Sequence, residues 1–313
     1  MKTIGIFFFF FKEFGLFQPL LREINNSDEI QFNLFVGGTH LAAEYGRTIE
    51  EIEESEFPVT ERFDYLLNND DHRSLAQSCG IESFQLAEIY KKYEFDLSCV
   101  LGDRIELLPI VLNAIVFRKP IIHIHGGEKS EGAIDEQVRH MVTKAAHLHF
   151  ASSEKYRRNI LQMGESSKRV FNTGALAVDN IIRIKKIPRE ELFEELGLNT
   201  GLETVLLTYH PVSMETRISP EDQIHNLFNA LNEFDLQIVI TEPGAETERN
   251  LTLDAIQSHV QGKEHYHIYK SLGVKKYLSL IAQCKFVIGN SSSGIIEVPN
   301  FRVPTINIGN RQR

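Results

Sequence analysis

The chain has 313 residues, of which 42% are hydrophobic and 24% charged, and its formal net charge is −10. This length suits two globular domains, while an acidic balance without lysine- or arginine-rich runs argues against nucleic acid or an anionic membrane as a partner. Three widely spaced cysteines exclude a disulfide framework and a zinc ribbon, and they indicate a reducing, cytoplasmic location. The apolar run near the start is too short to span a bilayer.

In the first half of the chain, segments typical of strands alternate with segments typical of helices. The predicted strands are Thr3–Phe11, Gln31–Val36, Leu97–Leu101, Pro120–Ile124, His147–Ser152 and Val170–Asn172. The predicted helices are Gly15–Ile24, Thr48–Glu56, Ser74–Tyr93 (where Asp71 to Ser74 offer N-cap chemistry), Ile105–Phe117 and Glu154–Met163. This alternation predicts a parallel sheet with crossover helices, so the predicted fold class is α/β.

A polar segment, Arg183–Leu196, interrupts the alternation, and Pro188 marks a break within it. We therefore predict an N-terminal domain over residues 1–180 and a C-terminal domain over residues 190–313. The predicted strands of the second domain are Val205–Tyr209, Leu236–Thr241, His265–Tyr269, Phe286–Gly289 and Val303–Ile308. Its predicted helices are Pro220–Phe234, capped by Ser219, and one that starts at about Ile295.

Ionisable residues gather just past the carboxyl ends of two successive predicted strands, where ligands bind in open α/β sheets. Proton abstraction from carbon needs a well-placed base, with an acid on the other side. The alternative is that these are ordinary surface carboxylates. The candidate acid–base residues are Asp103, Glu128, Glu131 and Asp135.

Histidines form a second candidate group. His123 and His125 share one face of a strand end, and together with Glu128 they could ligate a metal. The other members of the group are His140, His147, His149 and His210. The sequence has no cysteine ligand nearby and no His-Glu-x-x-His motif, so we predict no metal site. For His147 and His149 we expect a buried histidine that is hydrogen-bonded to a neighbour.

The segment Asn290–Gly294 follows a predicted strand and precedes a predicted helix. Backbone N–H groups and serine hydroxyls at such a place suit a phosphate, although an ordinary N-cap is the alternative. Glu297, one turn later, could accept hydrogen bonds from ribose hydroxyls or be a charge in the first turn of the helix. The sequence has neither a Walker loop nor a Gly-x-Gly-x-x-Gly motif.

A series of motifs in a fixed order covers nearly the whole chain. They are Gly38–Leu41, Gly102–Arg104, His123–Glu128, Asp135-Glu136 with Arg139-His140, Thr143-Lys144, Tyr209–Val212, Gly289–Gly294 with Glu297, and Ile306–Gly309. Together they closely resemble the UDP-N-acetylglucosamine 2-epimerase family. The His-Gly-Gly-Glu and Arg-His motifs favour its hydrolysing branch.

The resemblance implies two Rossmann-like domains in a GT-B-type arrangement with a UDP-sugar substrate between them, no cofactor, and a homodimer or homotetramer. It implies that a base removes the C2 proton while UDP leaves C1, giving a 2-acetamidoglucal. Water then adds, so UDP-N-acetylglucosamine yields UDP and N-acetylmannosamine. The implied site residues are Asp103, Glu128 and Asp135 as acid–base carboxylates, His210 as a catalytic or phosphate-facing residue, Ser291, Ser292, Ser293 and Gly294 as UDP binders, and Glu297 as a ribose binder.

Three departures from the family pattern matter. Where the family has a small phosphate loop containing arginine, this chain continues its aromatic run Phe7–Phe11, with Lys12 as the nearest cation. Pro243–Glu246 stands where the family has Pro-Asn-Ala-Asp, and the chain stops soon after Gly309, so we expect an incomplete C-terminal domain. The aromatic run and the early end predict weak or absent hydrolysis.

Four alternatives remain open at this point. The same chemistry could act on a UDP-2,4-diacetamido-2,4,6-trideoxy sugar, on the way to legionaminic acid rather than sialic acid. The chain could instead be a non-hydrolysing 2-epimerase or a non-catalytic nucleotide-sugar-binding protein. A glycosyltransferase would share the architecture without needing a carboxylate cluster in its first domain.

Overall fold

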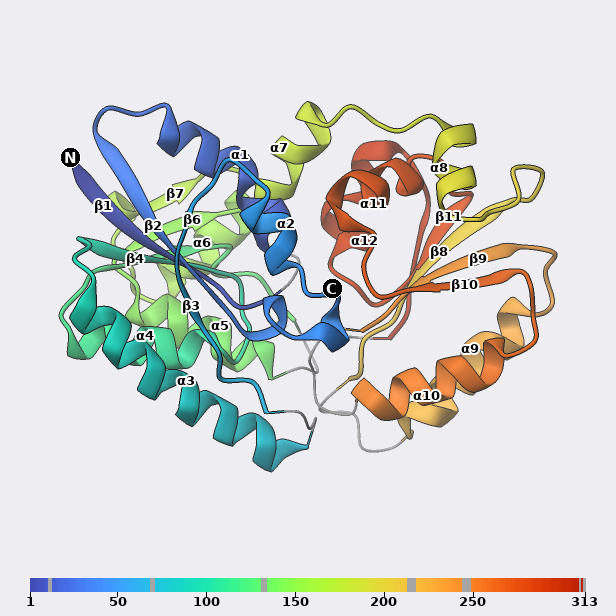
Figure 1. The fold of residues 1–313 in the computed structure, drawn as a ribbon, viewed down its shortest axis with the longest axis horizontal. Coiled ribbons are helices and arrows are strands. Elements are labelled where there is room, and N and C mark those ends of the chain that lie inside the picture. The colour runs from blue at the N-terminus through green and yellow to red at the C-terminus, as the bar shows by residue number, and fades with distance from the viewer. Residues whose placement is uncertain are drawn as a thin grey trace. The chain divides into compact units, whose positions relative to one another are not determined.

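The computed structural model describes residues 1–10, 13–67, 71–130, 134–212, 218–243, 249–309 and 311. The chain divides into two compact units, the first comprising Met1–Lys129 and Ile134–Leu176, the second Ser130–Ala133 and Ala177–Arg313. Each unit is built on one parallel sheet (Figure 1). This confirms the predicted α/β fold class with two Rossmann-like domains. Among the described residues, no helix is long and apolar enough to cross a membrane.

The first unit contains a seven-stranded sheet in the order β3-β2-β1-β4-β5-β6-β7. Its strands are β1 (Lys2–Phe8), β2 (Ile30–Gly37), β3 (Val59–Phe63), β4 (Leu97–Leu101), β5 (Ile121–Ile124), β6 (Leu148–Ala151) and β7 (Val170–Asn172). Its helices are α1 (Glu13–Asn25), α2 (Ile49–Glu53), α3 (His72–Lys92), α4 (Leu107–Val116), α5 (Asp135–Ala145) and α6 (Glu154–Gln162). The Asp71 side chain accepts the Ser74 N–H, which confirms N-cap chemistry at the start of α3.

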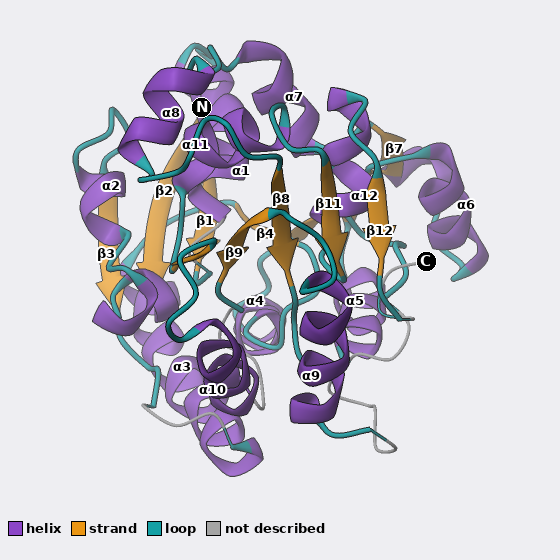
Figure 2. Ribbon diagram, turned by 90° about the vertical axis from the view of Figure 1, so that its right-hand side faces the viewer, coloured by secondary structure: helices purple, strands orange, loops and turns teal. Residues whose placement is uncertain are grey.

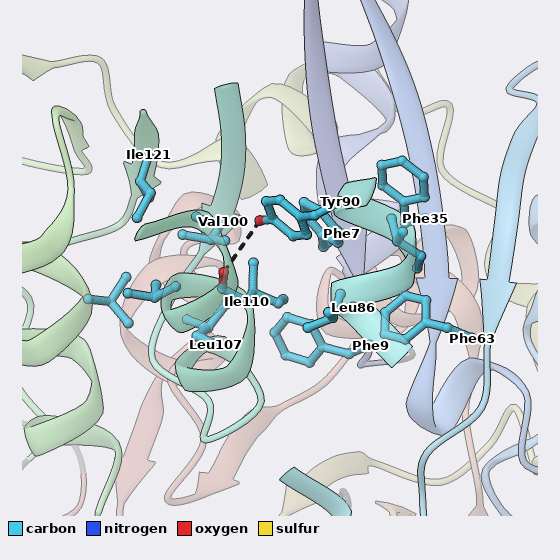
Figure 3. Close-up of a cluster of buried hydrophobic side chains, with 14 of the residues drawn as sticks. Phe7, Phe9, Phe35, Phe63, Leu86, Tyr90, Val100, Leu107, Ile110 and Ile121 are labelled. Atoms are coloured by element: carbon cyan, nitrogen blue, oxygen red, sulfur yellow. Dashed lines mark hydrogen bonds between the residues drawn. The ribbon is translucent and has the colours of Figure 1, made fainter. Parts of the chain in front are cut away.

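The aromatic run accounts for the two-sided burial of β1. Phe7 and Phe9 pack with α3, α4 and α5 on one face of the sheet (Figure 3), while Phe8 packs with α1 and α2 on the other. Side chains alternate between faces along a strand, and a strand covered on both sides reads as continuously apolar. Strict alternation along the whole aromatic run would put Phe10 on the face of Phe8, but β1 ends at Phe8, and Phe10 packs against the cluster of Phe7.

The second unit contains a five-stranded sheet in the order β10-β9-β8-β11-β12. Its strands are β8 (Thr204–Thr208), β9 (Gln237–Thr241), β10 (Tyr266–Tyr269), β11 (Phe286–Gly289) and β12 (Thr305–Asn307). Figure 2 shows β8, β11 and β12 running side by side in one direction. The helices that follow α6 are α7 (Leu176–Arg183), α8 (Arg189–Glu195), α9 (Pro220–Leu231), α10 (Arg249–Val260), α11 (Gly273–Ile281) and α12 (Ser293–Ile296). Helices α8 and α11 cover one face of this sheet, and α9 and α10 cover the other.

Several elements differ from the sequence-based expectation. The edge strand β3 is half polar and pairs with β2 through a register shift, so it lacks the apolar run that marks a buried strand. Helices α5, α7, α10 and α11 were not predicted, and α10 mixes polar and apolar residues on several sides. The polar segment Arg183–Leu196 contains α8, and Pro188 is its N-cap residue rather than a mere break.

Each sheet has one position where the strand order reverses, between β1 and β4 in the first and between β8 and β11 in the second. In open parallel sheets, ligands bind beyond the carboxyl ends of the strands at such a position. The segments found there are Phe9-Phe10 and Gly102–Arg104 in the first unit, and His210-Pro211 and Asn290–Gly294 in the second.

The turn after β1 is closed by a buried carboxyl group. Glu13 Oε2 accepts the backbone N–H groups of Phe9 (2.8 Å) and Phe10 (3.0 Å), and the residue is 4% exposed. Burial raises the pKa of Glu13 from 4.5 to about 8, against the lowering effect of the two N–H donors. The nearby Glu106 carboxylate raises this pKa further. Glu13 is therefore protonated in the folded protein at neutral pH.

We expect Glu13→Gln to flatten the pH dependence of stability. Because the folded pKa of Glu13 lies above its ordinary value, its contribution is complete below pH 4.5 and is lost as the pH rises to about 8. The loss is on the order of several kcal/mol, and glutamine offers the same acceptor without titrating. Urea unfolding between pH 5 and pH 8.5 measures this, with the exposed Glu88→Gln as control. Equal pH slopes for Glu13→Gln and the parent would contradict the expectation.

Candidate active site

Asp103 follows β4, and its carboxylate forms an ion pair with Arg139 of α5. The Arg139 side chain is 6% exposed and that of Asp103 is 22% exposed. Within the described part of the chain, Nε and Nη1 of Arg139 have no hydrogen-bond partner. Buried donors of this kind are uncommon in folded proteins and suggest a ligand or a water molecule. The guanidinium therefore holds Asp103 and can donate two further hydrogen bonds.

Glu128 follows β5 and is 9% exposed. Its Oε1 accepts hydrogen bonds from Ser152 Oγ (2.5 Å) and His125 Nδ1 (3.1 Å). Burial by itself would raise the pKa of Glu128, but the hydrogen bond from His125, the charge of the Arg139 guanidinium and the hydrogen bond from Ser152 together bring this pKa below its ordinary value. Glu128 is therefore an ionised carboxylate at neutral pH, and chemically a proton acceptor.

His125 has a backbone φ of +63°, in the left-handed region that side chains with a Cβ rarely adopt. Its Nε2 accepts the backbone N–H of Leu176 at 3.3 Å. An acceptor at Nε2 requires the proton of a neutral imidazole to sit on Nδ1, facing Glu128. The two contacts thus define the tautomer of His125.

The other predicted histidines are engaged elsewhere. His123 is fully buried, its Nε2 lies 2.8 Å from the Gly102 carbonyl and its Nδ1 3.1 Å from Thr143 Oγ1. Burial lowers the pKa of His123 to about 3, so it stays neutral and holds the loop after β4. His149 is buried beside Glu165, whereas His147 is exposed, so a buried position for His147 is wrong. Across the described ranges, no group of three or more His, Cys, Asp or Glu residues could hold a metal ion.

The remaining candidates of the first unit stand as follows. Asp135 begins α5 and is partly buried, one helical turn before Arg139, so both residues lie on the same side of the helix. Glu131 lies outside the described residues, as do Phe11 and Lys12. Next to the described end of the aromatic run, the guanidinium of Arg104 lies 4.5 Å from the centre of the Phe10 ring. Arg104 thus supplies a cation next to this loop, whereas the sequence analysis named Lys12 as the nearest cation.

In the second unit, the ends of β8 and β11 are joined by one side chain. Asn290 Oδ1 accepts the backbone N–H of His210 (2.7 Å), and its Nδ2 donates to the His210 carbonyl (2.8 Å). Asn290 is fully buried and His210 is 5% exposed. Asn290 thereby sets the position of His210 beside the serine-rich segment. This brings His210 to the strand-order reversal together with the predicted UDP-binding residues.

The three serines after Asn290 differ in their surroundings. Ser293 is buried, and its Oγ accepts the Tyr277 hydroxyl at 2.8 Å. Ser291 is partly buried and Ser292 exposed, so these two have the more accessible hydroxyls. The Gly294 N–H donates to the Ser291 carbonyl (3.1 Å). Helix α12 has four residues, so its dipole is small. For attracting a phosphate at this place, the serine hydroxyl groups therefore count for more than the N-terminus of the helix.

Glu297 is partly buried one turn after Ser293, directly beyond α12. Arg139 and Ser152 were not among the sequence-based candidates, while His125 had been considered only as a metal ligand and Asn290 only as the start of the phosphate segment. Arg139 and Asn290 both stand inside the quoted motifs, and Arg139 follows Asp135 at the four-residue spacing that places two side chains together on a helix. That spacing could have identified Arg139 from the sequence as a neighbour of Asp135. Nothing local marks Ser152, which directly follows the neighbouring strand β6.

Comparison with known proteins gives consistent matches. The profile of the family described as UDP-N-acetylglucosamine 2-epimerase matches residues 22–313. The chain is 36% identical over 303 residues (96% of this chain, 78% of the relative) to GDP/UDP-N,N'-diacetylbacillosamine 2-epimerase (hydrolyzing) of Campylobacter jejuni. It is 33% identical over 300 residues (96% and 79%) to UDP-N,N'-diacetylbacillosamine 2-epimerase (hydrolyzing) of Legionella pneumophila.

The fold has close counterparts among solved structures. The crystal structure of Methanocaldococcus jannaschii UDP-GlcNAc 2-epimerase in complex with UDP-GlcNAc and UDP matches with a TM-score of 0.80. The match covers 99% of this chain and 84% of that chain at 15% sequence identity. At that identity it shows a shared fold.

Proposed function

The chain belongs to the UDP-N-acetylglucosamine 2-epimerase family, and from this premise we propose that it is a hydrolysing 2-epimerase of UDP-linked 2-acetamido sugars. The observation that carries the proposal is the ionised carboxylate of Glu128, held at the carboxyl edge of the first sheet close to the Arg139–Asp103 ion pair. A base that is charged at neutral pH is what abstraction of the C2 proton requires.

The reaction has two stages whose atoms balance. A carboxylate takes the proton from C2, the C2 electron pair forms a C1–C2 double bond, and the C1–O bond breaks so that UDP departs. Water then adds its hydroxyl to C1 while a proton returns to C2 from the opposite face. The products are UDP and a free sugar inverted at C2. The positive Arg139 can stabilise negative charge during the first stage.

The roles proposed for the remaining residues follow from their positions. Asp103 and Asp135 would supply the other acid–base groups, and His210, held by Asn290, would face the substrate or its phosphates. Hydroxyl and N–H groups at the end of β11 suit a diphosphate, and Glu297 suits ribose hydroxyls. The proposed UDP-binding residues are Ser291, Ser292, Ser293, Gly294 and Glu297.

For the sugar, we propose UDP-N,N'-diacetylbacillosamine as the first candidate, because relatives that are 36% and 33% identical carry the name of its 2-epimerase. This sugar is a 2,4-diacetamido-2,4,6-trideoxy hexose, and the chemistry at C1 and C2 is the same as for UDP-N-acetylglucosamine. UDP-N-acetylglucosamine, after which the family is named, is the second candidate and serves as the comparison substrate.

The test is incubation of each nucleotide sugar alone in deuterated water. Release of UDP without an acceptor, together with a free manno-configured product carrying deuterium at C2, is the expected result. Binding without UDP release would point to a non-catalytic protein, and dependence on an acceptor to a glycosyltransferase. A product that keeps UDP would identify a non-hydrolysing epimerase.

The rates of UDP release in this experiment also test the prediction of weak hydrolysis. Because Phe8 and Phe9 are core residues, that prediction is better probed at Phe10 than by replacing the whole run.

Replacing Ser291 and Ser292 with alanine should weaken UDP binding. Each substitution removes a hydroxyl that can donate to an ionised phosphate, a hydrogen bond worth about 1.5–3 kcal/mol. Isothermal titration with UDP measures the effect, and Ser258→Ala, on the exposed side of α10, serves as the control. Unchanged UDP affinity in the double variant would remove this segment from the phosphate site.

A further inference from the structure

The segment after β5 holds His125 in an unusual conformation by tight packing on both sides of the turn. A Cβ at Gly126 would lie 2.9 Å from His123 Nδ1, and one at Gly127 would lie 2.5 Å from the Tyr156 carbonyl. The glycines let the backbone turn closely against β5 and α6. A left-handed residue with a full side chain persists where its surroundings hold it, and such residues cluster at functional sites.

Both ring nitrogens of His125 are used, each for a different purpose. Nε2 receives the backbone N–H of Leu176 (3.3 Å), so the proton lies on Nδ1 and is directed at Glu128 Oε1 (3.1 Å). The imidazole side chain is 11% exposed, as is the side chain of Glu128. The ring therefore connects a main-chain donor to a buried carboxylate.

The hydrogen bonds that Glu128 accepts go to one of its two carboxylate oxygens. Among the described residues, Ser152 and His125 both donate to Oε1. Oε1 is thereby anchored, and Oε2 is left to receive a proton. Other charged or titratable groups that act on this pair are Arg139 of α5, His123 of β5 and Tyr156 of α6, with Asp103 bound to Arg139.

We propose that His125 is a positioning residue, whose Nδ1–H anchors one oxygen of Glu128 and keeps the carboxylate ionised, so that the other oxygen can take the C2 proton. This inference rests on the proposed function and names the residue that prepares its base. With its backbone in the left-handed region, His125 brings Nδ1 to 3.1 Å from Glu128 Oε1.

The experiment compares four proteins with the parent. His125→Gly removes the ring and keeps the backbone conformation. His125→Asn keeps a donor, and His125→Asp replaces it with a negative charge. Asparagine and aspartate both tolerate the left-handed region. The control is Arg118→Gly, at another left-handed position, φ +56°, which is exposed.

With the substrate that releases UDP, we expect His125→Gly to lower kcat by about 10²-fold with KM changed by less than about threefold. The acid limb of the kcat profile should move up by about one pH unit, since burial still raises the Glu128 pKa when the donor is gone. The kcat of His125→Asn should be about tenfold higher than that of His125→Gly. A parental rate and acid limb in His125→Gly would overturn the inference.

A second readout does not depend on activity. In protein with ¹³C-labelled glutamate carboxyls, the Glu128 resonance is identified by its loss in Glu128→Gln, and its titration is followed by NMR. The Glu128 pKa should rise in the order parent, His125→Asn, His125→Gly, His125→Asp. Equal values in the parent and His125→Asp would overturn the inference, and this pair suffices if His125→Gly does not fold. If the parent releases no UDP, the proposed function fails while the titration still decides the role of His125.

Discussion

Replacing Glu128 with glutamine should lower the rate of UDP release by ~10²–10⁴-fold, the usual contribution of one positioned acid or base. Glutamine keeps the size and the acceptor oxygen for Ser152 and His125, so the fold and the hydrogen bonds can persist. It cannot take a proton from carbon at neutral pH. The loss should therefore fall on kcat, with little change in UDP affinity.

The measurement is steady-state UDP release with both nucleotide sugars, combined with thermal unfolding to confirm that the variant is folded. Glu154→Gln, on the accessible side of α6, is the matched control, because its side chain is 47% exposed. Asp103→Asn and Asp135→Asn are expected in the same range. A folded Glu128→Gln variant that releases UDP at the parental rate would exclude Glu128 as the base.

Replacing Gly289 with alanine should cost several kcal/mol of stability and abolish UDP binding. An added Cβ would lie 1.9 Å from the carbonyl oxygen of Thr208, on the neighbouring strand β8, and the backbone φ of +142° disfavours any side chain. Strands β8 and β11 would have to separate at their carboxyl ends. Asn290 could then no longer hold His210 beside the serines.

Chemical denaturation and UDP titration test this second expectation. The control is Gly80→Ala in α3, where an added Cβ meets nothing within 4 Å and alanine should stabilise the helix by about 0.5–1 kcal/mol. Opposite signs for the two variants would show that close approach of β11 to β8, rather than glycine content, is responsible. Parental stability of Gly289→Ala would mean that the two strands do not meet so closely.

Much of the fold follows from patterns within short stretches of the sequence. Apolar runs that end in a polar or glycine-containing segment marked strands such as β4 and β11 at their observed bounds. Ser219, as predicted, caps α9 by accepting the Asp222 N–H. These features depend on neighbours two to four residues apart, which the sequence displays directly. The family, and with it the candidate carboxylates and serines, was also readable from motifs.

The arrangement around those candidates depends on tertiary structure. Asp103 and Arg139 are 36 positions apart, and His210 and Asn290 are 80 apart. The left-handed turn at His125 and the buried carboxyl of Glu13 likewise have no periodic signature. Strand order decides which loops become neighbours, and burial then decides which of their groups carry charge. Neither strand order nor burial is a property of a short stretch of chain, because both arise when distant segments pack together.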